Sequence, residues 1–187
     1  MHRRELLTLL DSHRTHFPEE AGFVDRARRF VLDHPDCFHR DLLPGHVTGS
    51  AWVVNPARDR ALMLHHGKHD RWFQPGGHAD GDADILRVAL RETAEETGLE
   101  PDRIRLVDGT VFDLDHHVIP AQAHFPEHFH FDVRFLVEID DRLPVPGSVE
   151  SHEVLWLPLN EVPRLNNNRS TWRMLEKTRR LRTSLPL

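Results

Sequence analysis

The stretch RETAEETGL, residues 91–99, gathers three glutamates and ends at a glycine. At about 100° per residue of helix, Glu92, Glu95 and Glu96 fall on one face. Glu92 and Glu96 are also a like-charged pair four residues apart, which destabilises an isolated helix by a few tenths of a kcal/mol. A bound cation would remove this repulsion. The segment therefore suggests a metal-binding helix, and a solvated acidic face is the alternative.

The segment before this helix favours the metal site. Residues 71–82, RWFQPGGHADGD, contain Pro75, Gly76, Gly77 and Gly81, which predicts an irregular loop. We expect a helix over 83–97, with Asp82 as N-cap and Gly98 as the left-handed residue that ends it. A glycine-rich loop that leads into an acidic helix can present carbonyl and carboxylate oxygens to one point. These are the ligands that Mg²⁺ prefers.

The rest of the chain predicts alternating helices and strands. Helical spacing of apolar residues runs from Arg3 to about His34 with a break near Pro18. The Asn-Pro turn after residue 54 predicts a hairpin. The expected strands are 47–54, 60–66, 104–115, 128–139 and 153–159, and a last helix covers 170–182, capped by Asn168 or Ser170. This order predicts an α/β (α+β) fold, in which a mixed β-sheet is sandwiched between helices.

Composition limits the class of protein. The 187 residues suit one domain, and 39% hydrophobic with 29% charged residues is ordinary for a globular chain. No apolar run approaches the ~18 residues of a membrane span, so we expect no membrane partner. The net charge of −6 argues against a nucleic-acid surface. Cys37 is the only cysteine, which fits a reducing cytoplasm.

Spacing around the acidic helix suggests a family. Gly77, Arg91, Glu92, Glu95, Glu96, Gly98 and Leu99 follow the pattern G-x5-E-x7-R-E-U-x-E-E-x-G-U, so this segment resembles the Nudix box. The resemblance implies the Nudix fold, with a Nudix hydrolase domain over 45–187 and an N-terminal helical extension over 1–44 that packs on the core. Two positions depart from the pattern: Ala83 replaces the first glutamate, and Thr93 replaces the first aliphatic residue.

The resemblance also implies a chemistry. Nudix hydrolases cleave a diphosphate linkage in a nucleoside diphosphate derivative, here a nucleotide sugar, a dinucleotide or a nucleoside triphosphate, by water attack at phosphorus. By resemblance, Glu92 and Glu96 are the principal ligands of Mg²⁺ or Mn²⁺, Glu95 is a further ligand or holds one, and the carbonyl of Gly76 contributes from the loop. Arg91 is expected to orient a glutamate. Since the missing box glutamate normally braces this arginine, one of the nearby aspartates, Asp80, Asp82 or Asp84, is expected to replace it.

The general base is expected beyond the box. In some Nudix enzymes a glutamate from a later loop takes the proton from water. VESHEVLW, residues 149–156, offers Glu150 and Glu153 in the corresponding region. We favour Glu150, because Glu153 begins a strand-like run. The alternative for each is a loop acid that faces solvent.

Strict alternation marks the strand HFHFDVRF, residues 128–135. His128, His130, Asp132 and Arg134 share one face, and apolar side chains occupy the other. We expect the apolar face to be core and the polar face to line the pocket, with Asp132 and Arg134 binding substrate. Trp72 is a further candidate, as a platform for a base. The alternative is a polar sheet face satisfied by water or loops.

Histidine is over-represented, with 16 copies. The positions of His39, His46, His78, His128 and His130 resemble the metal-binding region of isopentenyl diphosphate isomerase, another Nudix-fold enzyme. A second, nitrogen-rich site formed by His46, His78, His128 and His130 would suit Zn²⁺, Mn²⁺ or Ni²⁺. The isomerase activity does not carry over, because Gly76 stands where that enzyme has a cysteine and the chain has no tyrosine.

Other functions stay open at this point. A Nudix-fold sensor that binds a nucleotide metabolite without hydrolysing it is the main alternative, and an isomerase-like enzyme is a weaker one. Sensors tend to lose the box acids, whereas Glu92, Glu95 and Glu96 are all present. The expected partner is a small-molecule nucleotide, and the sequence leaves both a monomer and a homodimer open.

Overall fold

The computed structural model describes residues 2–67, 70–121, 125–148 and 151–183. Over these described residues the fold is α+β, with a mixed β-sheet and four α-helices. The described chain divides into two compact units. Unit 1 comprises the residues up to Ser50, Gly76–Ala89 and Gly109–Phe135; unit 2 comprises Ala51–Pro75, Leu90–Asp108 and the described residues from Leu136 onward.

Unit 1 contains two antiparallel strand pairs. The first half of β1 (Gly45–Val54) pairs with β4 (Gly76–His78), so that Thr48 lies opposite His78. The pair formed by β6 (Asp113–Ile119) and β7 (His128–Glu138) places Asp113 opposite Arg134. These pairings bring the histidines of three separate segments into one unit.

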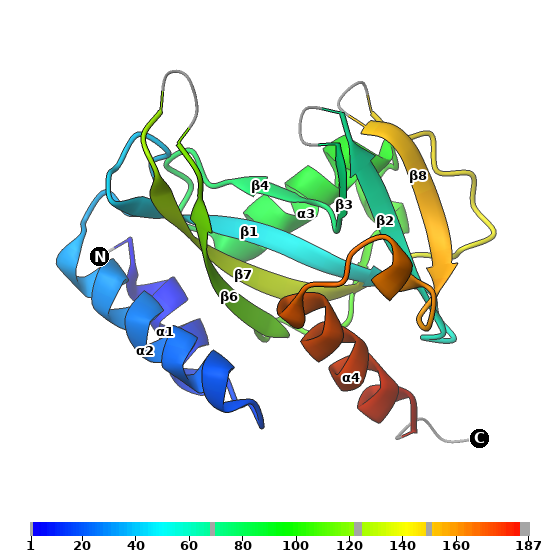
Figure 1. The fold of residues 1–187 in the computed structure, drawn as a ribbon, viewed down its shortest axis with the longest axis horizontal. Coiled ribbons are helices and arrows are strands. Elements are labelled where there is room, and N and C mark those ends of the chain that lie inside the picture. Colours follow the sequence, from blue (N-terminus) through cyan, green and yellow to red (C-terminus); the bar gives the residue numbers. More distant parts are fainter. Residues whose placement is uncertain (1, 68–69, 122–124, 149–150, 184–187) are drawn as a thin grey trace. The chain divides into compact units, whose positions relative to one another are not determined.

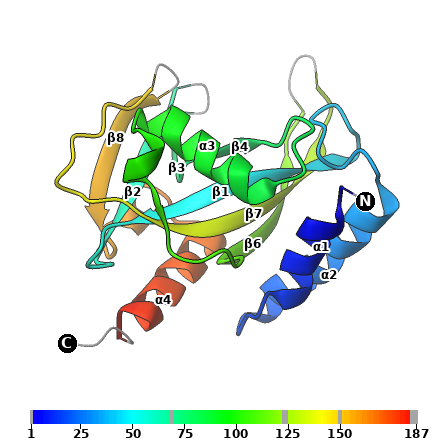
Figure 2. The same cartoon turned by 180° about the vertical axis from the view of Figure 1, so that it is seen from behind.

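The apolar spacing predicts two helices at the N-terminus, and both are present. They belong to unit 1. Helices α1 (Arg4–Ser12) and α2 (Pro18–Asp33) lie side by side, and α2 lies against β6 (Figures 1 and 2). The buried carboxylate of Glu20 accepts a hydrogen bond of 2.8 Å from the backbone N–H of Leu114. The domain boundary at residue 45 stays a prediction.

Unit 2 contains the predicted hairpin. The second half of β1 is antiparallel to β2 (Arg60–His66), with Val54 opposite Ala61. Strand β2 also pairs with β3 (Arg71–Phe73) and β8 (Ser151–Pro158). Strand β5 (Arg105–Leu106) pairs with the end of β7. One buried apolar cluster of unit 2 comprises Ala51, Val53, Leu62, Val137 and Ile139.

The last helix, α4 (Arg169–Thr183), also belongs to unit 2. Its N-cap is Asn168, one of the two predicted caps, whose side-chain oxygen accepts a 2.7 Å hydrogen bond from the N–H of Thr171. Buried Trp52 donates a hydrogen bond of 2.9 Å from its indole to Thr178 on this helix. None of the helices in the described ranges has the length and apolarity needed to cross a membrane.

The loop before the acidic helix is more regular than predicted. The short strands β3 and β4 lie inside 71–82 because their backbones pair with β2 and β1, and local composition does not report such pairing. Helix α3 (Ile85–Thr97) begins two residues later than expected. Its N-cap is Asp84 rather than Asp82, since Asp84 accepts the N–H of Arg87 at 3.0 Å. Gly98 has a φ of 69°, which confirms the predicted stop.

Two predictions about strands need correction. Only Arg105–Leu106 and the residues from Asp113 onward are strand within the expected extended run 104–115. On β7, the apolar face is not simply core, because Phe129 is 37% exposed. The polar face is not open either: His128, Asp132 and Arg134 are all buried. Side chains of β1 and β6 contact Asp132 and Arg134 on the polar face, whereas part of the apolar face stays exposed at Phe129.

Candidate active site

Arg91 contacts two of the glutamates on the acidic face of α3. Arg91 donates a hydrogen bond of 2.7 Å from Nη2 to Oε1 of Glu92, and its Nε lies 3.8 Å from Oε1 of Glu95. The Glu92 side chain is 18% exposed and that of Glu95 62% exposed, while Glu96 is half-buried. One guanidinium therefore holds the half-buried Glu92 carboxylate in place and reduces the repulsion between it and its neighbours.

Gly76, the predicted carbonyl ligand, lies on β4 in unit 1. Opposite it on β1 is Ser50. A Cβ added at Gly76 would lie 2.2 Å from the hydroxyl oxygen of Ser50, so only glycine fits at this point of the strand pair. The close approach restricts the backbone of Gly76, and its role as a carbonyl ligand stays a prediction.

A cluster of imidazoles occupies unit 1. His46 on β1, His78 on β4 and His130 on β7 each offer a ring nitrogen, and these three atoms lie within 4.8 Å of one another. His128 is adjacent, with its Nε2 3.3 Å from Nε2 of His130. The structure thus brings together the four histidines predicted for a second metal site. His39 is placed differently, with its ring against Gly81.

Burial keeps the inner histidines neutral. Burial and the neighbouring rings of His78 and His128 lower the pKa of His46 to about 4. Burial, followed by the surrounding histidines, lowers the pKa of His130 to about 2. Both shifts disfavour the imidazolium form, so these rings have a lone pair at neutral pH.

The next two residues on the same face of β7 form a buried ion network. Arg134 donates to Asp132 at 2.7 Å, to Asp113 at 3.1 Å and to Asp115 at 3.2 Å. Burial alone would lower the pKa of Arg134, but the charges of these three carboxylates outweigh burial and raise it. Asp132 also accepts hydrogen bonds from Thr48 and Ser50 on β1, at 3.0 and 2.6 Å.

The sequence reading missed Asp113 and Asp115. Both lie on one face of β6, and their alternation with Leu114 was the available signal, but the β6–β7 register was needed to pair them with Arg134. The predicted roles of Asp132 and Arg134 in substrate binding stay predictions. In the structure the Arg134 side chain is 5% exposed and engaged by carboxylates.

Comparison with known families decides the classification. A sequence model of the NUDIX domain matches residues 45–178, which is most of the chain and includes the loop, α3 and β7. The chain belongs to the Nudix family. Within this Nudix domain, the positions of Gly77, Arg91, Glu92, Glu95 and Glu96 are those of the Nudix box named above.

Two curated relatives carry the same name. A bis(5'-nucleosyl)-tetraphosphatase [asymmetrical] of Mus musculus is 31% identical over 103 residues, which cover 54% of this chain and 62% of the relative. Its Rattus norvegicus counterpart is 38% identical over 53 residues, or 28% of this chain and 33% of the relative. The matches therefore span less than two thirds of these relatives.

Solved structures share the Nudix fold. A C. elegans Ap4A hydrolase in a binary complex has a TM-score of 0.61 at 17% identity, covering 74% of this chain and 98% of the other. A NUDIX-family hydrolase from Clostridium perfringens has a TM-score of 0.54 at 19% identity, covering 73% and 97%. At such identities the likeness concerns the fold alone.

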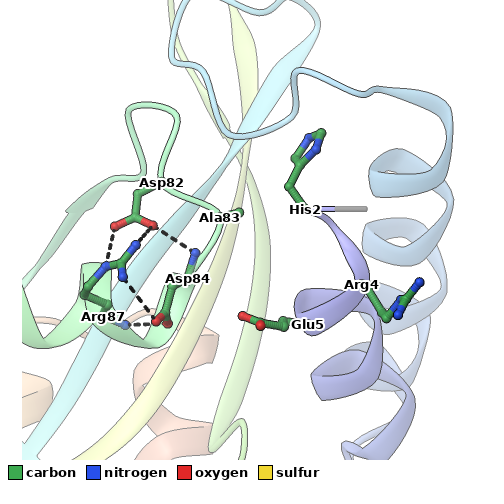
Figure 3. A pocket seen from close by; sticks show the side chains of 7 residues that line it. All are labelled: His2, Arg4, Glu5, Asp82, Ala83, Asp84 and Arg87. Atoms are coloured by element: carbon green, nitrogen blue, oxygen red, sulfur yellow. Dashed lines mark hydrogen bonds and ion pairs between the residues drawn. The ribbon is translucent and has the colours of Figure 1, made fainter.

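The departure at Ala83 lies in a small polar pocket of unit 1 (Figure 3). Beside it, Asp82 and Asp84 are engaged with Arg87: Arg87 donates to Asp82 at 2.9 Å, and its Nη1 lies 3.8 Å from Asp84. Asp80 pairs with Arg40. Whether one of the three aspartates braces Arg91 stays a prediction.

Two further predicted residues lie away from α3 in the chain. Trp72 on β3 is half-buried, and its ring stacks on that of His65 with centroids 4.9 Å apart. Its backbone carbonyl accepts a 2.8 Å hydrogen bond from Asn166. Glu150, the preferred general base, lies outside the described residues. Glu153 is exposed near the start of β8, opposite His65.

Proposed function

We propose that this protein is a metal-dependent Nudix hydrolase that cleaves a diphosphate linkage in a nucleoside diphosphate derivative by water attack at phosphorus. The observation that carries the proposal is the arrangement on α3, where Arg91 holds Glu92 within a helix whose sequence matches the Nudix box. A merely solvated acidic face would not need a half-buried carboxylate held by a neighbouring guanidinium.

The donor chemistry of α3 fits the ion that the family implies. The carboxylate oxygens of Glu92, Glu95 and Glu96 are hard ligands suited to Mg²⁺ or Mn²⁺. When bound, such ions neutralise the phosphate charge and lower the pKa of water. In the proposal, Glu92 and Glu96 hold the metal, Arg91 orients Glu92, and Glu150 accepts the proton of the attacking water.

The substrate class that we favour is a dinucleoside polyphosphate. Two mammalian relatives are named bis(5'-nucleosyl)-tetraphosphatase, and a fold neighbour is named Ap4A hydrolase. Such a substrate has several phosphoanhydrides and two bases. Trp72 is the proposed platform for one base, because its ring already stacks on a flat imidazole.

A substrate panel tests this proposal. Ap4A, a nucleotide sugar and a nucleoside triphosphate are incubated with the full chain and Mg²⁺ or Mn²⁺, and the nucleotide products are separated by chromatography. The proposal predicts metal-dependent turnover with the highest kcat/KM for Ap4A. Turnover of the nucleotide sugar alone would overturn the substrate class. Tight nucleotide binding without any turnover would overturn hydrolysis and favour the sensor.

A further inference from the structure

The histidine cluster of unit 1 contains a polar group that the proposed hydrolysis does not use. His46 is 1% exposed, and neither of its ring nitrogens has a hydrogen-bond partner among the described residues. The backbone of Leu42 is near enough to affect the pKa of His46, but without a hydrogen bond of normal geometry the buried ring is not compensated for its lost hydration. A buried polar group of this kind in a folded protein indicates that a ligand binds to it.

The neighbours of His46 are other imidazoles. The ring of His46 lies 5.0 Å from that of His78, 5.0 Å from that of His128 and 4.6 Å from that of His130, measured between centroids. Neutral imidazole lone pairs do not attract one another, and they do not attract an anion. They do coordinate a cation, and the ring nitrogens of His46, His78 and His130 already lie within 4.8 Å of one another.

The tautomer of His128 gives a second, independent indication. Its Nδ1 lies 2.9 Å from the carbonyl oxygen of Pro126, and because a carbonyl only accepts, Nδ1 has the proton. Nε2 of His128 is therefore the lone-pair nitrogen, and it accepts a hydrogen bond of 3.3 Å from Nε2 of His130. A ring that donates one nitrogen to a backbone carbonyl and presents the other inward is oriented as metal-ligating histidines are.

Charge in the surroundings favours a cation. The same face of β7 continues into the network in which Arg134 is shared by Asp113, Asp115 and Asp132. Three carboxylates to one guanidinium make this region of unit 1 rich in negative charge. His117 connects the two clusters, since its Nδ1 lies 3.2 Å from Asp115 and its ring 5.7 Å from that of His130.

We propose that His46, His78, His130 and His128 form a binding site for a divalent transition-metal ion of the Zn²⁺ class, distinct from the carboxylate site on α3. Four imidazole ligands and no carboxylate suit Zn²⁺ and disfavour Mg²⁺, which prefers oxygen. Since the ligands come from β1, β4 and β7, the ion would cross-link three strands of unit 1. It would therefore stabilise the folded chain in proportion to its occupancy.

The binding experiment uses the full, untagged chain, because a histidine tag would itself bind the probe. The variant Glu92→Gln/Glu95→Gln/Glu96→Gln removes the acidic site on α3. After chelator treatment, this variant is titrated with ZnCl₂ by calorimetry, and the Zn²⁺-loaded protein is examined by X-ray absorption. We expect one equivalent of Zn²⁺ with imidazole scattering at about 2.0–2.1 Å, and a rise in Tm on loading.

Histidine variants in the same background assign the ligands. His46→Gln is expected to weaken Zn²⁺ binding by at least about 100-fold, more than the loss of an outer-shell partner. Half-buried His78→Gln is the second variant, should His46→Gln fail to fold. His16→Gln, at an exposed histidine, is the matched control and leaves binding unchanged. Zn²⁺ affinity equal in all variants, or no bound Zn²⁺ in the starting protein, would overturn the site whatever the hydrolase assay shows.

Discussion

Nη2 of Arg91 lies 2.7 Å from Oε1 of Glu92, its immediate neighbour on α3. The contact makes the arginine a positioning residue for a predicted metal ligand. It also gives a physical reason for the charge order of the acidic helix. A guanidinium beside the glutamates reduces their repulsion before any ion binds, and it restricts the orientations that the Glu92 carboxylate can adopt.

Replacing Arg91 by alanine therefore impairs catalysis more than folding. Loss of an outer-shell partner typically costs roughly 10- to 100-fold in metal affinity or activity. We expect a fall of that size in kcat at fixed Mg²⁺, and partial recovery at higher Mg²⁺. Steady-state assays over a Mg²⁺ series measure both. Arg180→Ala, which removes a pair with Glu176 on α4, is the control; an equal loss of activity in both variants would contradict the positioning role.

Replacing Arg134 by methionine destabilises the fold. The substitution leaves Asp113, Asp115 and Asp132 without their shared guanidinium, and breaking a buried pair in this way costs roughly 3–5 kcal/mol. Urea denaturation measures the loss. Arg142→Met, at an exposed pair with Asp140, should leave stability unchanged. If Arg134→Met instead keeps its stability and raises KM, the residue binds substrate as the sequence pattern suggests.

Gly49 on β1 allows α3 to lie against the strand. A Cβ at this position would be 2.8 Å from the carbonyl oxygen of Ile85 and 3.1 Å from a methyl group of Val88. Gly49→Ala is therefore expected to cost about 1–3 kcal/mol through overpacking. Gly109→Ala is the matched control, because its added Cβ meets no described atom within 4 Å. Equal melting temperatures for the two variants would show that the strand and helix are not closely packed.

Cys37 is predicted to be unreactive in the folded protein. Its side chain is fully buried, and burial raises its pKa to about 11 from an ordinary value of 9.0. A thiol-specific reagent at pH 8 should label the native chain far more slowly than the chain in urea. The unfolded thiol ionises first as the pH rises, so the stability due to this group is lost from about pH 9 upward. Equal labelling of native and unfolded chains would contradict its burial.

The acidic helix and the hairpin could be predicted because their determinants are local. The spacing of Glu92, Glu95 and Glu96 follows the helical repeat, and Gly98 ends the helix through its own backbone conformation. Strand β4 could not be found in this way. It exists because Gly76 fits closely against Ser50, a residue far away in the sequence.

The surroundings of the buried polar residues of unit 1 could likewise not be predicted from local sequence. Alternation along β7 correctly places His128, His130, Asp132 and Arg134 on one face, but it does not say whether that face is open or covered. The partners that cover Arg134 come from β6, and their identity depends on register. The four histidines could be named from the sequence, whereas the unpartnered nitrogens of His46 are visible only in the folded chain.

In the proposed function, the carboxylates of α3 hold the metal ions for phosphoanhydride hydrolysis. Its most direct test is the rate of Ap4A hydrolysis by Glu96→Gln at saturating Mg²⁺, with exposed Glu100→Gln as control and thermal melting to confirm folding. We expect kcat to fall by at least about 100-fold in Glu96→Gln and not in the control. This is more than the loss of an outer-shell partner of a metal typically costs. Turnover by Glu96→Gln equal to that of the unmodified chain would contradict it.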